Sequence, residues 1–252
     1  MIDIHSHIIP GVDDGAKTLD ESFEMLRIAA QHGTTDIVAT PHASIEFRFD
    51  EAVVKARILD MQEGAGAVIR IHRGCDFHLT YDNIHDAMLH PSKYTVNGKR
   101  YLLVEFSDLV IFRTTDQVFD EFLAKGIVPI VTHPERNPLL RQRIEQLRGW
   151  AQRGVLMQVT AQSLTGFWGS QAQSFTDTLL EEGMAHVFAS DAHDPERRPP
   201  ILSDAYAEIE DRYGRETAEQ LFVETPRAVI EGLPVSLPMI KRPSRKAWFK
   251  FW

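Results

Sequence analysis

The sequence predicts an α/β fold in which parallel strands form a closed or nearly closed barrel of seven strand–helix units. Two observations carry this prediction. Short apolar runs rich in β-branched residues alternate with stretches of helical period, and such alternation favours a parallel sheet. In addition, 252 residues is about the usual length of a single β/α barrel, and 43% hydrophobic residues can fill its core.

The expected strands are seven short runs, one fewer than in the usual eight-unit barrel. Each is rich in Val, Ile, Leu or Thr, as strands commonly are. They span residues 2–5, 36–40, 68–72, 101–105, 127–132, 155–160 and 186–190.

Helical stretches lie between most of these runs. Thr18-Leu-Asp-Glu21 matches a capping box, so a helix is expected to begin there and to end before Gly33. Asn97-Gly98 is a tight-turn signal and predicts a hairpin leading into the run at 101–105. Further helices are expected over residues 50–62, 115–125, 139–153, 170–182 and 203–212.

Charge and composition argue against several classes of protein. The net charge of −9 argues against a nucleic-acid-binding surface. The single cysteine, Cys75, cannot form an intramolecular disulfide and suits a reducing compartment, so the cytoplasm is the expected location. No apolar stretch approaches the roughly 20 residues of a membrane span.

A basic, aromatic tail over residues 238–252 is expected to follow a single domain over residues 1–237. From residue 241 onward the chain carries five basic residues and no acidic one. Its aromatic side chains favour packing on the body of the protein. The alternative is a weak contact with an anionic membrane or an acidic partner. The residues concerned are Lys241, Arg242, Arg245, Lys246, Lys250, Trp248, Phe249, Phe251 and Trp252.

Histidines and carboxylates recur where the expected strands end. His5 and His7 are two residues apart after an apolar run, so on a strand their side chains point to the same side. Similar residues follow later runs, in Pro41-His42, Thr132-His133 and Ser190-Asp-Ala-His193. Active sites of β/α barrels lie at the carboxyl ends of the strands. We therefore expect these side chains to gather at one site.

The expected site is a metal centre with nitrogen and carboxylate ligands and no sulfur, which suits Mn, Fe, Zn or Co. The set is too large for one ion, so two or three divalent ions are expected. Asp13 is interpreted as a turn residue, and the remaining histidines, His78 among them, as surface or packing residues. The candidate ligands are His5, His7, Asp14, His42, Asp76, Glu105, His133, Asp191 and His193.

Two arginines accompany the candidate ligands and indicate phosphate chemistry. Arg136 follows His133 by three residues, and Arg198 follows His193 by five. A guanidinium group can hold phosphate oxygens through two hydrogen bonds, and metal clusters commonly hydrolyse phosphate esters. A cysteine-dependent phosphatase is excluded, because no arginine and no glycine-rich phosphate cradle follow Cys75.

These motifs resemble the PHP superfamily, named after polymerase and histidinol phosphatase. More closely, the chain is similar to the bacterial capsule and exopolysaccharide tyrosine phosphatases of that superfamily, over about residues 1 to 230. The matching segments are Asp3-Ile-His-Ser-His7, Val12-Asp-Asp-Gly15, Thr40-Pro-His42, Glu105, His133-Pro-Glu-Arg136 and Ser190-Asp-Ala-His193.

The resemblance implies a distorted TIM-like (β/α)7 barrel, a manganese-dependent centre of three ions and hydrolysis of phosphotyrosine. It implies as target the phosphorylated tail of a tyrosine kinase that controls polysaccharide export. Asp76 departs from the pattern, because such enzymes commonly carry a bridging glutamate there. Two alternatives stay open, a small-molecule phosphatase of the histidinol phosphate type and a catalytically silent barrel that binds a phosphorylated protein.

Overall fold

The computed structural model describes residues 1–235, so the predicted tail over residues 238–252 lies outside the described residues. The described chain confirms an α/β fold with parallel strand pairing throughout. The sheets have the orders β1-β2-β4 and β3-β5-β6-β7-β8-β9. The strands are β1 (Ile2–Ser6), β2 (Asp36–Ala39), β3 (His42–Ala43), β4 (Arg70–Arg73), β5 (Asp76–His78), β6 (Tyr101–Glu105), β7 (Val128–Thr132), β8 (Leu156–Thr160) and β9 (Val187–Ala189).

The two sheets meet where β2 continues into β3 and β4 continues into β5. Across this break the amide of Gly74 donates to the carbonyl of Ala39 (2.9 Å), and the amide of Asp76 donates to that of Pro41 (3.1 Å). Gly74 is required here, since a Cβ atom would lie 2.8 Å from Val38 and 2.9 Å from Thr40. The two breaks therefore leave seven strand positions, as the sequence predicted.

At the other junction, β1 lies against the segment that follows β9. The amide of Asp191 donates to the carbonyl of His5 (2.9 Å), and that of His7 donates to Ala192 (2.8 Å). Asp3, on β1, accepts hydrogen bonds from the amide and the hydroxyl of Ser190 at 3.1 and 2.5 Å. These bonds fix the segment that carries Asp191 against the end of β1.

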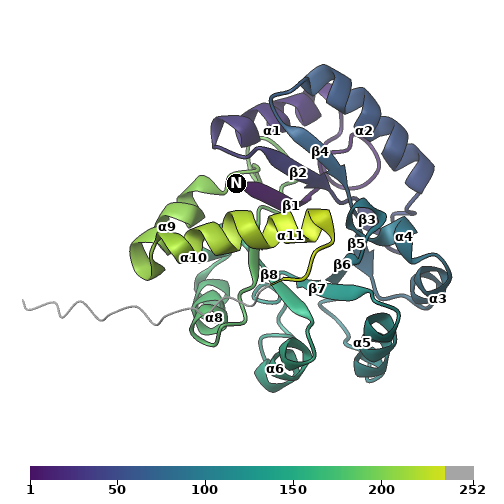
Figure 1. Cartoon of the computed structure of the whole chain (residues 1–252), viewed down its shortest axis with the longest axis vertical. Coiled ribbons are helices and arrows are strands. Elements are labelled where there is room, and N and C mark those ends of the chain that lie inside the picture. The colour runs from purple at the N-terminus through teal and green to yellow at the C-terminus, as the bar shows by residue number, and fades with distance from the viewer. Residues whose placement is uncertain (236–252) are drawn as a thin grey trace, which may run out of the picture.

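Helices surround the strands (Figure 1). The Thr18 hydroxyl caps the first helix, as predicted, by accepting from the amide of Glu21. The helix expected at 139 begins later, at Ile144, because the Asn137 side chain holds residues 139 and 140 in a turn. The helices are α1 (Leu19–Gln31), α2 (Glu51–Ala65), α3 (Tyr81–Leu89), α4 (Pro91–Tyr94), α5 (Thr115–Ala124), α6 (Ile144–Gln152), α7 (Ala161–Leu164), α8 (Ser170–Glu181), α9 (Ser203–Tyr213), α10 (Arg215–Glu219) and α11 (Thr225–Glu231), with a short 3-10 helix η1 (Val96–Gly98) and a short π-helix η2 (Gln220–Glu224).

The predicted hairpin at Asn97-Gly98 is wrong. Asn97 does adopt a left-handed backbone (φ 53°), but it lies in η1, between α4 and β6. Strand β6 then pairs in parallel with β5 and β7. The Asn97 side chain donates to the carbonyl of Ile230 (2.9 Å), so this turn ties the start of β6 to α11.

The hydrophobic core has an inner and an outer part. The inner cluster combines side chains of the strands, such as Ile4, Leu103 and Ile130, with Val229 and Ile230 of α11. It includes residues at or near the amino ends of β6 to β9, so α11 covers that end of the barrel. A larger cluster lies between the strands and the outer helices. The carboxyl ends of the strands are left to form a site.

Candidate metal centre

The structure brings all nine predicted ligands together at the carboxyl ends of the strands. Most are fully or largely buried, and they form four overlapping groups that could each hold an ion. The groups are His7, Asp14, His42 and His193; His5, His7 and Asp76; His5, His133 and Asp191; and His42, Asp76, His78 and Glu105.

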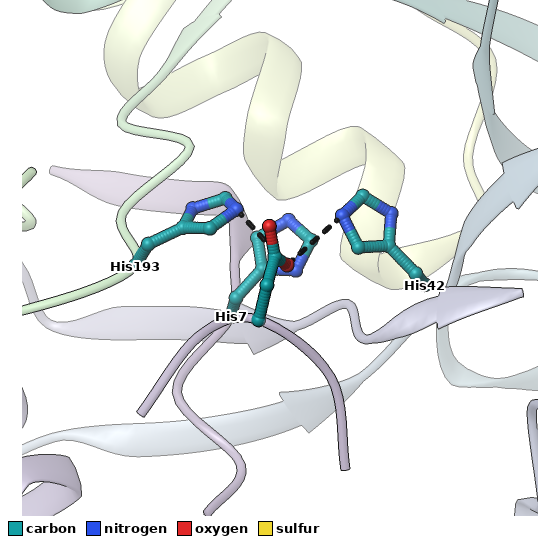
Figure 2. Close-up of side chains that lie close together, drawn as sticks. His7, His42 and His193 are labelled. Atoms are coloured by element: carbon teal, nitrogen blue, oxygen red, sulfur yellow. Dashed lines mark ion pairs between the residues drawn. The ribbon is translucent and has the colours of Figure 1, made fainter. Parts of the chain in front are cut away.

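The first group converges from separate segments. Figure 2 shows the rings of His7, His42 and His193 directed toward one another. The ring centroid of His7 lies 4.0 Å from that of His193 and 4.4 Å from that of His42. The Asp14 carboxylate completes the group, with Oδ1 lying 3.3 Å from Nε2 of His42 and 3.5 Å from Nε2 of His193.

The second and third groups share His5, which is completely buried. Nε2 of His5 lies 3.2 Å from Nε2 of His7, and 3.4 Å from a carboxylate oxygen of each of Asp76 and Asp191. The opposite nitrogen of His5, Nδ1, lies 2.9 Å from Oε1 of Gln158, which fixes the ring. His133 stacks on His5 with ring centroids 5.7 Å apart.

These spacings fit metal coordination. With bonds of about 2.1 Å and angles of about 90–110°, adjacent ligand atoms on one ion lie roughly 3.0–3.4 Å apart. The separations between neighbouring candidate ligand atoms fall mostly between 3.2 and 3.5 Å. Within residues 1–235, Oδ1 of Asp76 is buried without a hydrogen-bond donor. Because buried carboxylates need such partners, the residues fit bound cations.

Despite burial, the carboxylate of Asp13 raises the pKa of His7. Its Oδ2 lies 2.8 Å from Nδ1 of His7 and also accepts from the amide of His42 (3.1 Å). Burial alone would lower the pKa of His7, but the Asp13 carboxylate outweighs burial and raises that pKa to about 9. Burial of His42 is likewise outweighed, by Asp14 and Asp76, and its pKa rises to about 11.

Other members of the site have pKa values that favour ligation. Burial, assisted by the nearby charge of Arg136, holds the pKa of His133 well below its usual range. Burial and the neighbouring His7 lower the pKa of His193 to about 4. Asp191 is also buried, but His5 and Arg136 keep its pKa well below the usual value. Neutral imidazole and ionised carboxylate are the forms that bind metal ions.

Both predicted arginines lie beside the ligands. Both form ion pairs with Oδ2 of Asp191. Arg136 does so through Nη1, and Nη2 of Arg198 lies 2.5 Å from the same oxygen. The guanidinium carbon of Arg136 lies 3.8 Å from the ring centroid of Trp168, and that of Arg198 lies 5.2 Å away. Within residues 1–235, Nε of Arg198 is buried without an acceptor.

Two cavities open beside the centre. The larger, of about 700 Å³, is lined by Glu105, His133, Arg136 and Trp168 among others. A second, of about 490 Å³, is more apolar and is lined by side chains that include Ile45, Tyr81, Val110 and Phe112. Because both cavities reach His78 and Glu105, a ligand in either one would lie next to the candidate metal centre.

Sequence reasoning missed three residues of this site. Asp13 makes the expected turn through the amide of Gly15, but it also holds His7. His78, interpreted as surface or packing, lies in the fourth group. The sequence spacing could have identified His78, since Asp76 and His78 are two residues apart, as His5 and His7 are. Trp168 had no such signal, because it lies between α7 and α8 and reaches the arginines only through the fold.

A parallel α/β barrel with histidines and carboxylates at its strand ends is a metal-binding barrel, and this is the class that fold and site define. The model of the family described as "Capsular polysaccharide synthesis, CpsB/CapC" matches residues 1–231. The chain belongs to this family, which confirms the resemblance drawn from its motifs.

Relatives in this family are named as tyrosine phosphatases. The chain is 34% identical to the putative tyrosine-protein phosphatase CapC of Staphylococcus aureus, covering 82% of each chain. It is 32% identical to the tyrosine-protein phosphatase CpsB of Streptococcus pneumoniae, covering 91% of this chain and 98% of that one. One similar solved structure is described as YwqE from Bacillus subtilis and CpsB from Streptococcus pneumoniae, "unique metal-dependent tyrosine phosphatases". Its TM-score is 0.87 at 28% identity, covering 98% of this chain and 100% of the other.

Proposed function

We propose that this protein is a metal-dependent phosphotyrosine-protein phosphatase. The observation that carries the proposal is the placement of nine buried or half-buried histidine and carboxylate ligands beside two arginines and a cavity of about 700 Å³. Membership of a family whose relatives are named metal-dependent tyrosine phosphatases supports the same activity.

Each group of ligands has a definite place in this proposal. His7, Asp14, His42 and His193 would hold one ion, and His5, His133, Asp76, Glu105 and Asp191 would hold the others. Bound divalent ions supply a water of lowered pKa as nucleophile and neutralise charge on the phosphate. The chain orients the ligands: Asp13 fixes the ring of His7, and Gln158 fixes that of His5.

Arg136 and Arg198 would bind the phosphate oxygens of the substrate. Trp168 lies against both guanidinium groups and so restricts where they point. Phe106 and Trp168 line the same cavity and offer apolar surface to a phenol ring. Phenolate is a tolerable leaving group, with a pKa of about 10, so a strong general acid is not required.

We further propose manganese as the ion, because nitrogen and oxygen ligands without sulfur suit it. The proposed target is the phosphorylated tail of a tyrosine kinase that controls capsule or exopolysaccharide synthesis, in the cytoplasm. The sequence family and the buried free Cys75 support this proposal. Among the helices of residues 1–235, none is long and apolar enough to cross a membrane.

A comparison of two substrates tests the activity. A phosphotyrosine peptide and histidinol phosphate are supplied separately to the protein, once with EDTA and once with added Mn²⁺. We expect Mn²⁺-dependent phosphate release from the peptide and little from histidinol phosphate. Release from histidinol phosphate alone would replace the proposal with a small-molecule phosphatase, and metal binding without release from either would favour the silent barrel.

A further inference from the structure

We propose that His78 is an additional metal ligand, which supplies a nitrogen to an ion held by Asp76 and Glu105. The inference rests on the proposed metal centre and extends it. It comes from the fourth group of converging side chains, in which His78 is joined by His42, Asp76 and Glu105.

Strand geometry directs His78 into the site. Asp76, Phe77 and His78 form β5, and successive side chains on a strand point to opposite sides. Phe77 is fully buried in the outer cluster, between the strands and the helices. Asp76 and His78 therefore both face the other side, where the candidate ligands gather.

The distances around His78 fit a ligand of the centre. Nε2 of His78 lies 2.5 Å from Oε2 of Glu105 and 3.2 Å from Nδ1 of His42. The same nitrogen of His42 lies 3.2 Å from Oδ2 of Asp76 and 3.3 Å from Oε2 of Glu105. Apart from the short contact between His78 and Glu105, these spacings match those expected between ligand atoms on one ion, about 3.0–3.4 Å.

The position of His42 leaves the ion at Asp76 and Glu105 open to another nitrogen ligand. Its Nε2 faces Asp14 in the first group, whereas its Nδ1 faces Asp76 and Glu105. A neutral imidazole has a lone pair on one nitrogen and a proton on the other. If His42 ligates with Nε2 beside Asp14, then Nδ1 can only donate a hydrogen bond, and His78 supplies the nitrogen on the Asp76–Glu105 side.

His78 also lies where an ion would meet substrate. Its side chain is 29% exposed, whereas Asp76 is completely buried. His78 lines both cavities together with Glu105. An ion held by His78 would therefore be reachable from the cavity in which we place the phosphate.

Metal counting on a His78→Ala variant tests this assignment without relying on turnover. Apoprotein prepared with a chelator is titrated with Mn²⁺ by calorimetry, and bound manganese is counted by mass spectrometry after dialysis. His85→Ala is the matched control, since His85 is an exposed histidine of α3, seven residues after His78. We expect His78→Ala to lose one ion per chain or to bind it at least about tenfold more weakly.

Pulsed electron paramagnetic resonance on the Mn²⁺-loaded proteins gives a second readout. Loss of one nitrogen coupling in His78→Ala, but not in His85→Ala, would support direct ligation, because the other candidate histidines keep theirs. Unchanged manganese content, affinity and nitrogen coupling in His78→Ala would overturn the proposal and leave His78 as a hydrogen-bond partner of Glu105. A wild-type protein that binds manganese but does not hydrolyse phosphotyrosine would overturn the proposed function alone, because the metal counts still decide the role of His78.

Discussion

His133 and Asp191 both have a left-handed backbone, with φ values of 33° and 53°. Such a conformation is uncommon for residues other than glycine and costs of the order of 1–3 kcal/mol. The hydrogen bond from the amide of Asp191 to His5 helps to hold it in place. Both residues are candidate ligands, so backbone strain at this site coincides with the side chains that the proposed function needs.

Removing one ligand should abolish turnover without unfolding the barrel. Asp191→Asn is the preferred variant, because asparagine tolerates the left-handed backbone that Asp191 adopts. We expect phosphotyrosine hydrolysis to fall at least about 100-fold, as it should in His5→Ala. Steady-state kinetics and circular dichroism measure the two effects, with Asp204→Asn on the exposed face of α9 as control. Full activity in both ligand variants would contradict the cluster.

Asp13 should act on metal affinity rather than on the chemical step. It contacts Nδ1 of His7, so Asp13→Asn weakens the hold on that ring while leaving the ligand atom in place. Loss of such an outer partner typically costs about 10–100-fold in affinity. We expect a higher Mn²⁺ requirement with activity recovered at saturating metal, and no change in Asp20→Asn. A loss that excess Mn²⁺ cannot restore would assign Asp13 a different role.

Among single residues, the sequence predicted those that stand in a recognisable pattern along the chain. The nine candidate ligands follow predicted strands, and the strand ends of a barrel meet in space, so position and residue type were sufficient. Trp168 could not be predicted, because its contact with Arg136 depends on how the segment before α8 folds back. Asp13 could not either, since its turn-forming pattern masks its contact with His7.

The helices and strands were predictable where apolar residues recur clearly at the spacing of a helix or a strand. Strands β6 and β8 and helices α1, α5 and α8 fall close to the expected ranges. The short strands β3 and β5 were not predicted, because each lies beyond the end of the apolar run that predicted the strand before it. The hairpin prediction failed because Asn-Gly specifies a left-handed turn but not the elements that it joins.

His186, just before β9, should make folding sensitive to acid. Its Nδ1 accepts from the amide of Met157 (2.9 Å), and burial lowers its pKa to about 4. Between the unfolded value of about 6.5 and pH 4, the unfolded chain binds a proton that the folded chain does not, so stability falls as pH falls. The contribution is of the order of 3 kcal/mol.

Urea unfolding of His186→Asn in EDTA, at pH 7 and at pH 4.5, measures this contribution. Asparagine can place an oxygen near the position of Nδ1 and carries no titratable proton. We expect the variant to lose less stability than the wild type between the two pH values. An equal loss in both proteins would mean that His186 does not contribute to acid sensitivity.

On the scale of the whole molecule, the barrel has a closed end and a functional end. Helix α11 (Figure 1) packs on the amino side of the strands through Val229 and Ile230, while the candidate ligands occupy the carboxyl side. The seven-unit architecture was predictable from strand–helix alternation and length. The boundary between a domain ending at 237 and a basic tail stays a prediction, since it lies beyond the described residues.

Metal removal should lower the stability of the entire barrel. The ligands come from segments between His5 and His193, so bound ions tie together most strand positions. A ligand at 100 times its Kd stabilises the folded state by about 2.7 kcal/mol per site. We expect EDTA to lower the Tm by several degrees and Mn²⁺ to restore it, as followed by circular dichroism. An unchanged Tm would show that the ions do not couple to folding.

We propose above that these residues form a metal cluster that hydrolyses phosphotyrosine. The most direct test titrates metal-free protein with Mn²⁺ and measures, at each step, the bound metal and the rate of phosphate release from a phosphotyrosine peptide. We expect no release without metal and a rate that saturates when two or three ions are bound per chain. Release that is equally fast in metal-free protein, or that never appears with the ions bound, would contradict it.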